Sequence, residues 1–376
     1  MKLTTAGESH GKGLFGILEG LPAGLTVDIE EIDGYLALRQ SGYGRGARQK
    51  IERDRVEILS GVRDRKTLGS PVTLAVWNRD YENWKAYMAP EGCDTSARTL
   101  TGVRPGHADL TGLKKFGGSD ARNVLERASA RETAVRVAAG TLCRQLLRAL
   151  GIEVSGYVRA VGDVHDEGEY SFDSLSRRLP ELFMMDKALQ AQAMQFIDAC
   201  AGQGDTCGGV LELRVKGLRS GFGSCMTYAQ KLDARLAAAL MSVQAVKGVE
   251  VGLGFQVAAR CGSRVHDEIF YSEERGYFRD TNRAGGIEGG MSNGEELVLR
   301  AAMKPIPTLM RGLNTVDYTT HEAVRAATER SDVCAILACE VVLESALCCE
   351  LAAAILERLG ADNLADLADR YGRLPQ

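Results

Sequence analysis

The sequence has few of the features that mark disulfide-bonded, metal-binding or membrane proteins. Its ten cysteines never form a C-x-x-C pair, and several lie in apolar, helix-like runs. Such cysteines usually behave as small buried hydrophobes in a reducing compartment, so we expect neither disulfides nor a metal site. No apolar leader stands at the N-terminus, and the longest apolar stretch is interrupted by Glu340, Glu344 and Glu350. We therefore expect a cytoplasmic protein that does not enter a membrane.

A large excess of one charge is missing as well. The chain has 46 Lys and Arg against 50 Asp and Glu, which gives a formal net charge of −4. This balance provides no overall attraction to nucleic acid or to an anionic membrane. Any anion must therefore be bound by a local cluster of cations.

Signs of a domain boundary are also missing. The chain holds only eight prolines and no repeat, low-complexity tract or Pro/Ser-rich linker, so we expect one mixed α/β unit over residues 1–376. Residues 129–151 predict a strong helix, with Ser129 as N-cap and Gly151 just past its end. Further helical patterns cover residues 179–202, 232–246 and 321–359, before a short C-terminal helix, and strand-like patterns cover 14–29, 54–61, 70–78, 208–218 and 249–262.

The glycine pattern near the N-terminus does not predict a nucleotide site. Residues 11–16, GKGLFG, match G-x-G-x-x-G, but a Leu-Pro-Ala-Gly turn follows where a dinucleotide fold needs a helix. The P-loop pattern fails too, because Ala6 replaces its first glycine and Gly13 replaces the Ser or Thr after the lysine.

A basic segment over residues 39–55 is more informative. Arg39, Arg45 and Arg48 stand among glycines that let the backbone approach an anion. Guanidinium forks bind phosphate and carboxylate bidentately, which a lysine does not do. Taken alone, this segment is also explained by a solvated loop, the usual state of a charge run, and a second ordinary interpretation is an RNA-contacting patch.

Two histidines stand in polar turns. His10 lies in GESHG, and His107 follows an Arg-Pro-Gly turn two residues before Asp109. A histidine next to a carboxylate can be held in one tautomer for proton transfer. A turn histidine bonded to backbone is the competing interpretation for both.

Four further segments carry candidate site residues. ERASARET places Arg127, Ser129 and Arg131 at a helix start, where free N–H groups favour anions. The run GGIEGGMSNG needs a ligand or packed neighbours to become ordered. KPIPT holds Lys304 on an extended backbone, and RSDVCA places Asp332 at an expected helix start. The ordinary interpretation of the arginines in ERASARET and of Lys304 is exposure at the surface. The ordinary interpretation of Asp332 is a charge that satisfies free amides at a helix start.

Taken together and in this order, these motifs resemble the chorismate synthase family. The resemblance runs from Gly7 to about Glu344 and includes RQSGYGRG, RPGHAD and VQAVKGVEVG. It implies an α+β fold, a single-domain β-α-β sandwich with a helical layer between antiparallel sheets, assembled as a homotetramer. It also implies anti 1,4-elimination of phosphate from 5-enolpyruvylshikimate 3-phosphate to give chorismate, with reduced FMN and no net redox change.

The residue inventory suits that chemistry. The substrate carries two carboxylates and a phosphate, which arginine forks complement. A proton donor stabilises the leaving phosphate. The ring hydrogen that leaves is too weakly acidic for an ordinary base, and a reduced flavin that lends and recovers an electron explains a redox cofactor in a redox-neutral reaction.

The resemblance also implies roles for individual residues. His10 would protonate the departing phosphate, His107 would lie near the flavin pyrimidine ring, and Asp332 would assist proton removal through the flavin. The implied substrate-binding residues are Ser9, Arg39, Arg45, Arg48, Arg104, Arg131 and Arg330. The implied flavin-binding residues are Arg127, Ala128, Ser129, Gln244, Ala245, Gly289, Lys304, Pro305, Ile306, Pro307, Thr308 and Arg330.

The chain departs from the family pattern at three places near the flavin. Gln244 replaces a common Asn, Ala128 replaces a Ser, and Ser331-Asp332-Val333 stands where the family commonly has His-Asp-Pro. We expect activity to survive, because both histidines, Asp332 and the arginines remain. The flavin would be reduced by NADPH on this chain or by a separate flavin reductase, and the missing dinucleotide pattern favours the reductase.

Two other functions compete with this one. A different FMN-dependent oxidoreductase would consume its reductant, whereas elimination returns the flavin reduced. A non-enzymatic polyanion or RNA binder would interleave aromatic residues with its arginines, and the basic segment offers only Tyr43.

Overall fold

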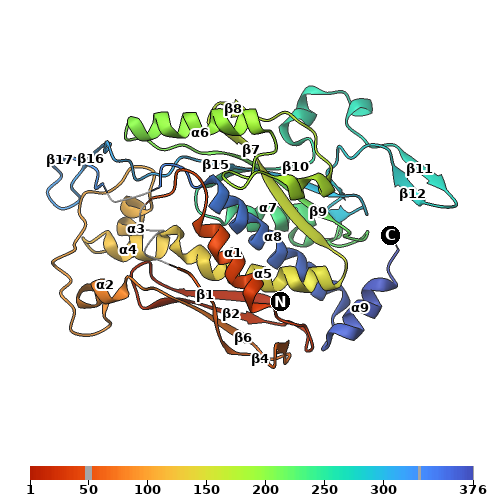
Figure 1. The fold of residues 1–376 in the computed structure, drawn as a ribbon, viewed down its shortest axis with the longest axis horizontal. Coiled ribbons are helices and arrows are strands. Elements are labelled where there is room, and N and C mark those ends of the chain that lie inside the picture. The colour runs from red at the N-terminus through yellow and green to blue at the C-terminus, as the bar shows by residue number, and fades with distance from the viewer. Residues whose placement is uncertain (47–52, 329–331, 376) are drawn as a thin grey trace.

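Two antiparallel sheets enclose a layer of helices in the computed structural model, which describes residues 1–46, 53–328 and 332–375 (Figure 1). The first sheet has the order β1 (Lys2–Gly7), β2 (Gly13–Glu19), β6 (Val72–Trp77) and β3 (Glu57–Ser60). The second has the order β10 (Val246–Val251), β15 (Leu297–Met303), β9 (Gly209–Lys216), β7 (Glu153–Val161) and β8 (Val164–His165). All neighbouring strands in both sheets run antiparallel, which confirms the expected α+β sandwich.

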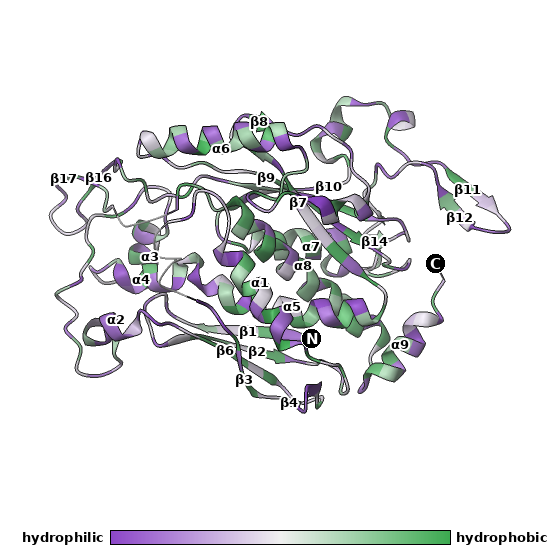
Figure 2. Cartoon of the chain, viewed as in Figure 1, coloured by the Kyte–Doolittle hydropathy of each residue, from purple (hydrophilic) through white to green (hydrophobic). Residues whose placement is uncertain are grey.

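The helical layer consists of α1 (Ile29–Gln40), α5 (Thr133–Ala149), α7 (Leu232–Met241) and α8 (Ile336–Leu359). Helix α5 packs on β2 and β6 of the first sheet, while α8 packs on β7 and β9 of the second. Because α8 is covered on all sides, apolar residues surround it instead of forming one stripe. Figure 2 shows this apolar character in the central helices.

Helices α5 and α8 cross closely because small residues meet there. A Cβ atom added to Gly140 would lie 2.4 Å from the Cβ of Ser345. The buried Ser345 hydroxyl donates to the carbonyl of Val341 at 2.8 Å, so this hydroxyl keeps a hydrogen-bond partner at the close contact. The pair fixes the centre of the helical layer.

The remaining elements surround this sandwich. Three short helices, α2 (Tyr81–Met88), α3 (Asp109–Phe116) and α4 (Arg122–Ala128), gather at one end, and α6 (Lys187–Gly202) covers the outer face of the second sheet (Figure 1). Helix α9 (Leu364–Gly372) follows α8. The hairpins are β4–β5 (Val62–Arg63, Lys66–Thr67), β11–β12 (Ile269–Ser272, Gly276–Arg279), β13–β14 (Ile287–Glu288, Met291–Ser292) and β16–β17 (Asn314–Val316, Ala323–Arg325).

Several boundaries differ from the sequence-based expectations. Ser129 does cap a helical turn, because its side chain accepts from the N–H of Arg131, but that turn is a 3-10 segment and α5 begins only at Thr133. Helix α7 ends at Met241, because the next residues turn into β10 and Ala245 adopts a φ of 72°. Helix α6 begins only after Asp186, which caps it.

The expectation of helix from residue 321 was wrong over its first part. Residues 323–325 form β17, which pairs with β16, and α8 begins at Ile336. Asp332 therefore lies before the helix and is not part of its first turn. Residues 249–262 are likewise only partly strand, because β10 ends at Val251 and a 3-10 turn covers Gly254–Ala259. Cysteine burial is also mixed, since Cys225 and Cys261 are exposed.

The acidic residues of α8 are buried with arginine partners. Arg144 of α5 and Arg178 both bind Glu344, and Arg178 also lies 3.1 Å from Glu340. Burial raises the pKa of Glu340, whereas at Glu344 the two arginines outweigh burial and lower the pKa. Of the helices in the described ranges, none is both long enough and apolar enough to cross a membrane.

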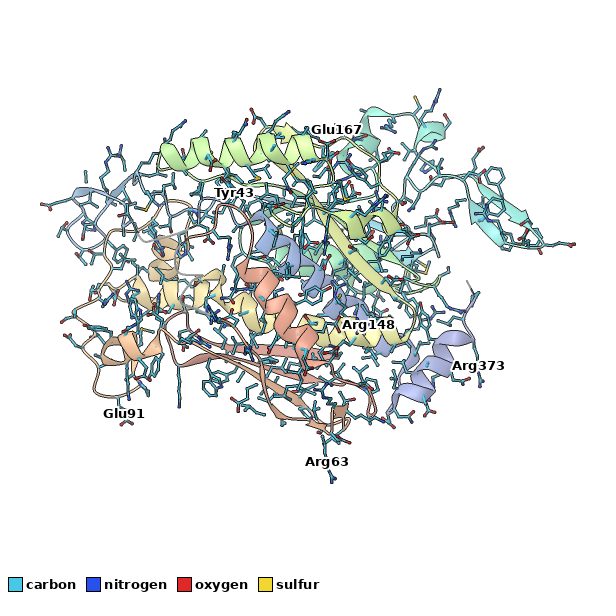
Figure 3. All side chains as sticks on the ribbon, viewed as in Figure 1. Tyr43, Arg63, Glu91, Arg148, Glu167 and Arg373 are labelled. Atoms are coloured by element: carbon cyan, nitrogen blue, oxygen red, sulfur yellow. The ribbon has the colours of Figure 1, made fainter. Side chains whose placement is uncertain are left out.

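We predict that Arg144→Met destabilises the fold strongly. The substitution leaves the Glu344 carboxylate with an incomplete set of cations in the core, which costs about 3–5 kcal/mol for a broken buried pair. Arg148, one turn further along α5 and labelled in Figure 3, is 57% exposed where it binds Glu31. Urea unfolding of Arg148→Met should show a loss of at most about 1 kcal/mol. Equal losses in the two variants would contradict this account of the core.

Candidate active site

The turn between β1 and β2 carries Ser9 and His10. Gly7 begins this turn with a φ of 108°, and a Cβ there would lie 2.3 Å from the carbonyl oxygen of Gly13, so only glycine fits. The N–H of Ser9 donates to the carbonyl of Glu126 at 2.9 Å. The turn is therefore fixed against α4. Glu8, the neighbouring carboxylate, is exposed.

His10 is buried and bound on two sides. Its Nδ1 lies 2.8 Å from Oε1 of Glu126, and its backbone N–H donates to Oε2 of Glu126 at 2.8 Å. Its ring stacks on Trp84 of α2, with 3.9 Å between the ring centroids. Burial acts to raise the pKa of Glu126, but the bonds from His10 and the charge of Arg122 outweigh it and lower that pKa. Glu126 therefore remains ionised beside His10.

His107 has a similar carboxylate partner. Its Nδ1 lies 2.5 Å from Oδ1 of Asp109, which confirms the contact expected from their spacing. Arg104 binds the same carboxylate through Nε at 2.8 Å and Nη2 at 3.1 Å. Burial acts to raise the pKa of Asp109, but His107 and Arg104 together lower it well below its usual range. Arg104 also donates to the Thr308 hydroxyl at 3.2 Å.

Asp54 holds two of the predicted arginines. Its Oδ2 lies 2.6 Å from Nη1 of Arg131 and 3.3 Å from Nη1 of Arg39. Arg39 also donates from Nε to the Thr133 hydroxyl at 2.9 Å, and Arg131 donates from Nε to Asn78 at 2.9 Å. Burial lowers the pKa of Arg39 to about 10 although Asp54 opposes that shift. Both guanidinium groups are therefore held in fixed orientations.

Arg45 and Asp332 form the third charged pair. Nη1 of Arg45 lies 2.8 Å from Asp332, and the N–H of Gly46 donates to the same carboxylate at 2.6 Å. Burial lowers the pKa of Arg45, with Asp332 opposing it. The buried Nε of Arg45 has no hydrogen-bond partner among the described residues. Such a donor is costly unless a ligand accepts from it.

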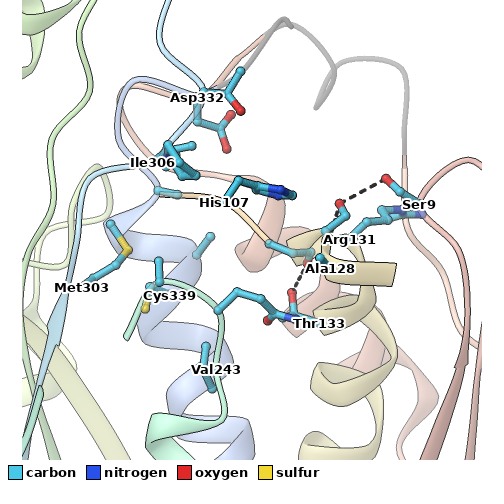
Figure 4. A pocket seen from close by; sticks show the side chains of 18 of the residues that line it. Ser9, His107, Ala128, Arg131, Thr133, Val243, Met303, Ile306, Asp332 and Cys339 are labelled. Carbon is cyan, nitrogen blue, oxygen red and sulfur yellow. Dashed lines mark hydrogen bonds between the residues drawn. The ribbon is translucent and has the colours of Figure 1, made fainter. Parts of the chain in front are cut away.

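These groups meet around one cavity of ≈ 420 Å³. Figure 4 shows Asp332, His107 and Ser9 along its upper part, and Met303, Cys339 and Val243 below them. The cavity therefore has a charged side and an apolar side. The predicted site residues that line it are Ser9, His10, Arg39, Arg45, Arg104, His107, Ala128, Ser129, Arg131, Gln244, Ala245, Lys304, Ile306, Pro307, Thr308 and Asp332.

Three predicted residues do not line the cavity. Arg127 donates to the carbonyls of Gly7 and Thr5 and thereby ties α4 to β1. Gly289 lies in the β13–β14 hairpin, and Pro305 is absent from the lining although its neighbours in KPIPT are present. Arg48 and Arg330 lie outside the described residues.

Two further lining residues, Lys304 and Gln244, are held by hydrogen bonds to other segments. Lys304 is not a free surface lysine. Its Nζ donates to the carbonyl of Gly106 at 2.5 Å, and its backbone N–H donates to the carbonyl of Ala245 at 2.9 Å. Gln244 donates to Glu132 at 3.2 Å, while its buried Oε1 has no partner within the described part of the chain. This part of the lining offers one unpaired acceptor beside an apolar floor. No group of three metal-ligating side chains was found in residues 1–46, 53–328 and 332–375.

Sequence reasoning missed the residues behind the site. Asp54, Asn78, Trp84 and Glu126 hold the cations and the His10 ring, but none stands next to its partner in the chain. The one available signal was charge balance, because buried arginines require buried carboxylates. That signal does not say which carboxylate serves which arginine.

Comparison with known proteins gives a consistent result over the whole chain. The family model for chorismate synthase matches residues 1–356. A chorismate synthase from Alkaliphilus metalliredigens is 52% identical over 368 residues, covering 97% of each chain. One from Desulforudis audaxviator is 53% identical over 377 residues, covering 99% of this chain and 97% of the relative. A crystal structure of a chorismate synthase aligns with a TM-score of 0.79 at 38% identity, covering 99% of this chain and 96% of that one.

We predict that Asp109→Asn flattens the acid limb of the stability profile. The folded-state pKa of Asp109 lies below the ordinary value of about 3.9, so its ionised form stabilises the fold at neutral pH. This stability is lost as the pH falls below about 5 toward the folded-state pKa. Urea unfolding at several pH values measures the slope. The exposed Asp173→Asn is the matched control and should keep the wild-type slope, and a wild-type slope in Asp109→Asn would contradict the assignment.

Proposed function

The chain belongs to the chorismate synthase family, a family of lyases, and from that premise we propose how its own residues carry out the reaction. The family converts 5-enolpyruvylshikimate 3-phosphate to chorismate with reduced FMN. The C–O bond to phosphate and one ring C–H bond break, and a C=C bond forms. We assign this chemistry to the ≈ 420 Å³ cavity.

One observation carries the assignment. Arg39, Arg45 and Arg131 all reach one cavity, and each is oriented by a carboxylate, which is the buried Asp54 for Arg39 and Arg131 and the cavity-lining Asp332 for Arg45. A substrate with two carboxylates and a phosphate needs several guanidinium forks at fixed positions. The unpaired Nε of Arg45 supports ligand binding on this side. Arg48, Arg104 and Arg330 complete the proposed substrate-binding set, with Ser9 as a hydrogen-bond partner.

His10 is the proposed proton donor to the departing phosphate. As the C–O bond breaks, negative charge grows on the phosphate oxygen, and a positioned acid stabilises it. His10 lines the same cavity as Arg39 and Arg131. Its bond to Glu126 leaves Nε2 as the nitrogen free to face the substrate.

The residues at the other side fit a flavin. The apolar residues Val243, Met303 and Ile306 suit a flat ring, and the unpaired Oε1 of Gln244 suits one of its N–H groups. When bound, reduced FMN supplies an electron that it recovers within the turnover. The proposed holding residues are Arg127, Ala128, Ser129, Gln244, Ala245, Gly289, Lys304, Pro305, Ile306, Pro307, Thr308 and Arg330. His107 and Asp332 are proposed to hold and move the proton beside the ring.

The assembly and its setting are proposed on separate grounds. The β11–β12 hairpin projects from the sandwich (Figure 1), and its Tyr271 and Tyr277 are 64% and 79% exposed. Large exposed aromatic residues on a projecting hairpin suit contact with a second copy, in keeping with a homotetramer of single-domain chains. Free thiols suit the cytoplasm, with a separate flavin reductase or NADPH as the source of electrons.

We predict phosphate release without net flavin oxidation. Anaerobic incubation of the protein with 5-enolpyruvylshikimate 3-phosphate and chemically reduced FMN should give phosphate and chorismate in equal amounts, with the flavin spectrum still reduced. His10→Ala and His107→Ala should each slow turnover by about 10²–10⁴-fold while FMN still binds, because acid–base catalysis contributes that range.

The exposed His165 on β8 provides the matched control, and His165→Ala should turn over like the wild type. Net oxidation of the flavin in step with product would favour the oxidoreductase instead. A folded wild-type protein that releases no phosphate would contradict the proposed function. Wild-type rates in both histidine variants would remove their proposed roles.

A further inference from the structure

We infer that Glu126 is a positioning residue for the reaction, which fixes His10 in the tautomer that carries its hydrogen on Nδ1 and presents Nε2 to the cavity. The inference rests on the proposed role of His10 as proton donor. Glu126 does not itself line the cavity, so it acts on the substrate only through His10.

Glu126 binds one residue, His10, through both of its carboxylate oxygens. Oε2 accepts from the backbone N–H of His10, and Oε1 lies 2.8 Å from Nδ1 of the same residue. The lowered pKa of Glu126 means that the carboxylate is ionised and only accepts. A hydrogen bond between Oε1 and Nδ1 therefore requires the hydrogen on Nδ1. Because both the backbone N–H and the ring Nδ1 of His10 are bound to Glu126, the orientation of the ring is fixed.

Glu126 is itself held in place by its neighbours. Its side chain is 3% exposed, and Nη1 of Arg122 lies 3.2 Å from Oε1. The backbone carbonyl of Glu126 accepts from the N–H of Ser9, so α4 binds the turn at two successive residues, Ser9 and His10. Trp84 covers one face of the His10 ring and prevents the ring from rotating away from the carboxylate.

A similar arrangement occurs at His107, built from different residues. There Asp109 binds Nδ1, and Arg104 binds Asp109. In both cases a buried carboxylate links an imidazole to a guanidinium, and the imidazole lines the cavity. The two pairs come from different segments, since Glu126 lies 116 residues from His10 whereas Asp109 lies two residues from His107. The chain thus builds the same carboxylate–imidazole pair twice from different segments, and both imidazoles line the cavity. This repetition indicates that the pair has a role in the cavity.

The chemical consequence concerns the proton that His10 gives up. An imidazolium that donates from Nε2 becomes the neutral Nδ1–H tautomer, and Glu126 stabilises both the charged ring and that neutral product. Glutamine has the same shape but no charge, and its amide either accepts from Nδ1–H or donates to a bare Nδ1. Glu126→Gln therefore removes the charge partner and the tautomer preference together.

The test combines nitrogen NMR with turnover. In ¹⁵N-labelled wild-type protein, the His10 ring, assigned by its loss in His10→Gln, should carry a hydrogen on Nδ1 at every pH at which the fold is intact. In Glu126→Gln this preference should be lost, and kcat for phosphate release should fall by about 10²-fold, within the range of acid–base catalysis. KM should change little, because Glu126 does not line the cavity.

Glu212→Gln is the matched control. Glu212 is a fully buried carboxylate on β9 that binds Arg214 and Arg300 and no histidine in the described residues. It should lower stability while leaving the His10 nitrogen signals unchanged. A structural role for Glu126 alone would give the same pattern as this control.

The outcomes separate the inference from the proposed function. An Nε2–H tautomer of His10 in the wild type overturns the inference even if Glu126→Gln fails to fold. Wild-type kcat and unchanged nitrogen signals in folded Glu126→Gln overturn it as well. A wild-type protein that releases no phosphate contradicts the proposed function, while its His10 spectrum still decides the tautomer.

Discussion

The pairing of carboxylates with cations around the cavity is the constraint on which the rest of the site depends. Asp54 holds Arg39 and Arg131, Asp332 holds Arg45, Asp109 holds Arg104 with His107, and Glu126 holds His10. An unpaired buried cation would be strongly destabilising, whereas a paired one remains charged and keeps its orientation. The cavity is thus lined by groups that need little rearrangement to bind an anion.

The fold explains why these pairs meet. The 3-10 turn that carries Arg131 leads directly into α5, and the segment that carries Asp332 leads into α8. Thr133 and Ala335, at the N-terminal ends of the two helices, both line the cavity. Helix N-terminal ends carry partial positive charge, so the two central helices reinforce the arginines. The close contact between α5 and α8 at Gly140 fixes the N-terminal ends of the two helices relative to each other.

Much of the front of the site could be predicted from the sequence, because its residues sit in short motifs. His107 and Asp109 are two residues apart, and their contact follows from the turn between them. The carboxylates behind the arginines could not be predicted in this way. Asp54 meets Arg131 across 77 residues, and Glu126 meets His10 across 116, so only tertiary packing decides those partners. The start of α8 was missed for a related reason, since the pairing of β17 with β16 overrides the local helical pattern.

The most direct test of this account is the affinity of Asp54→Asn for 5-enolpyruvylshikimate 3-phosphate, measured by titration calorimetry beside the wild type. The variant removes one negative charge from an anion-binding site, yet it also replaces the charged acceptor that orients Arg39 and Arg131 with a neutral amide. If orientation by buried carboxylates governs binding, the affinity of the folded variant falls by about tenfold or more. Equal or tighter binding would contradict the account, because net charge alone would then explain the site.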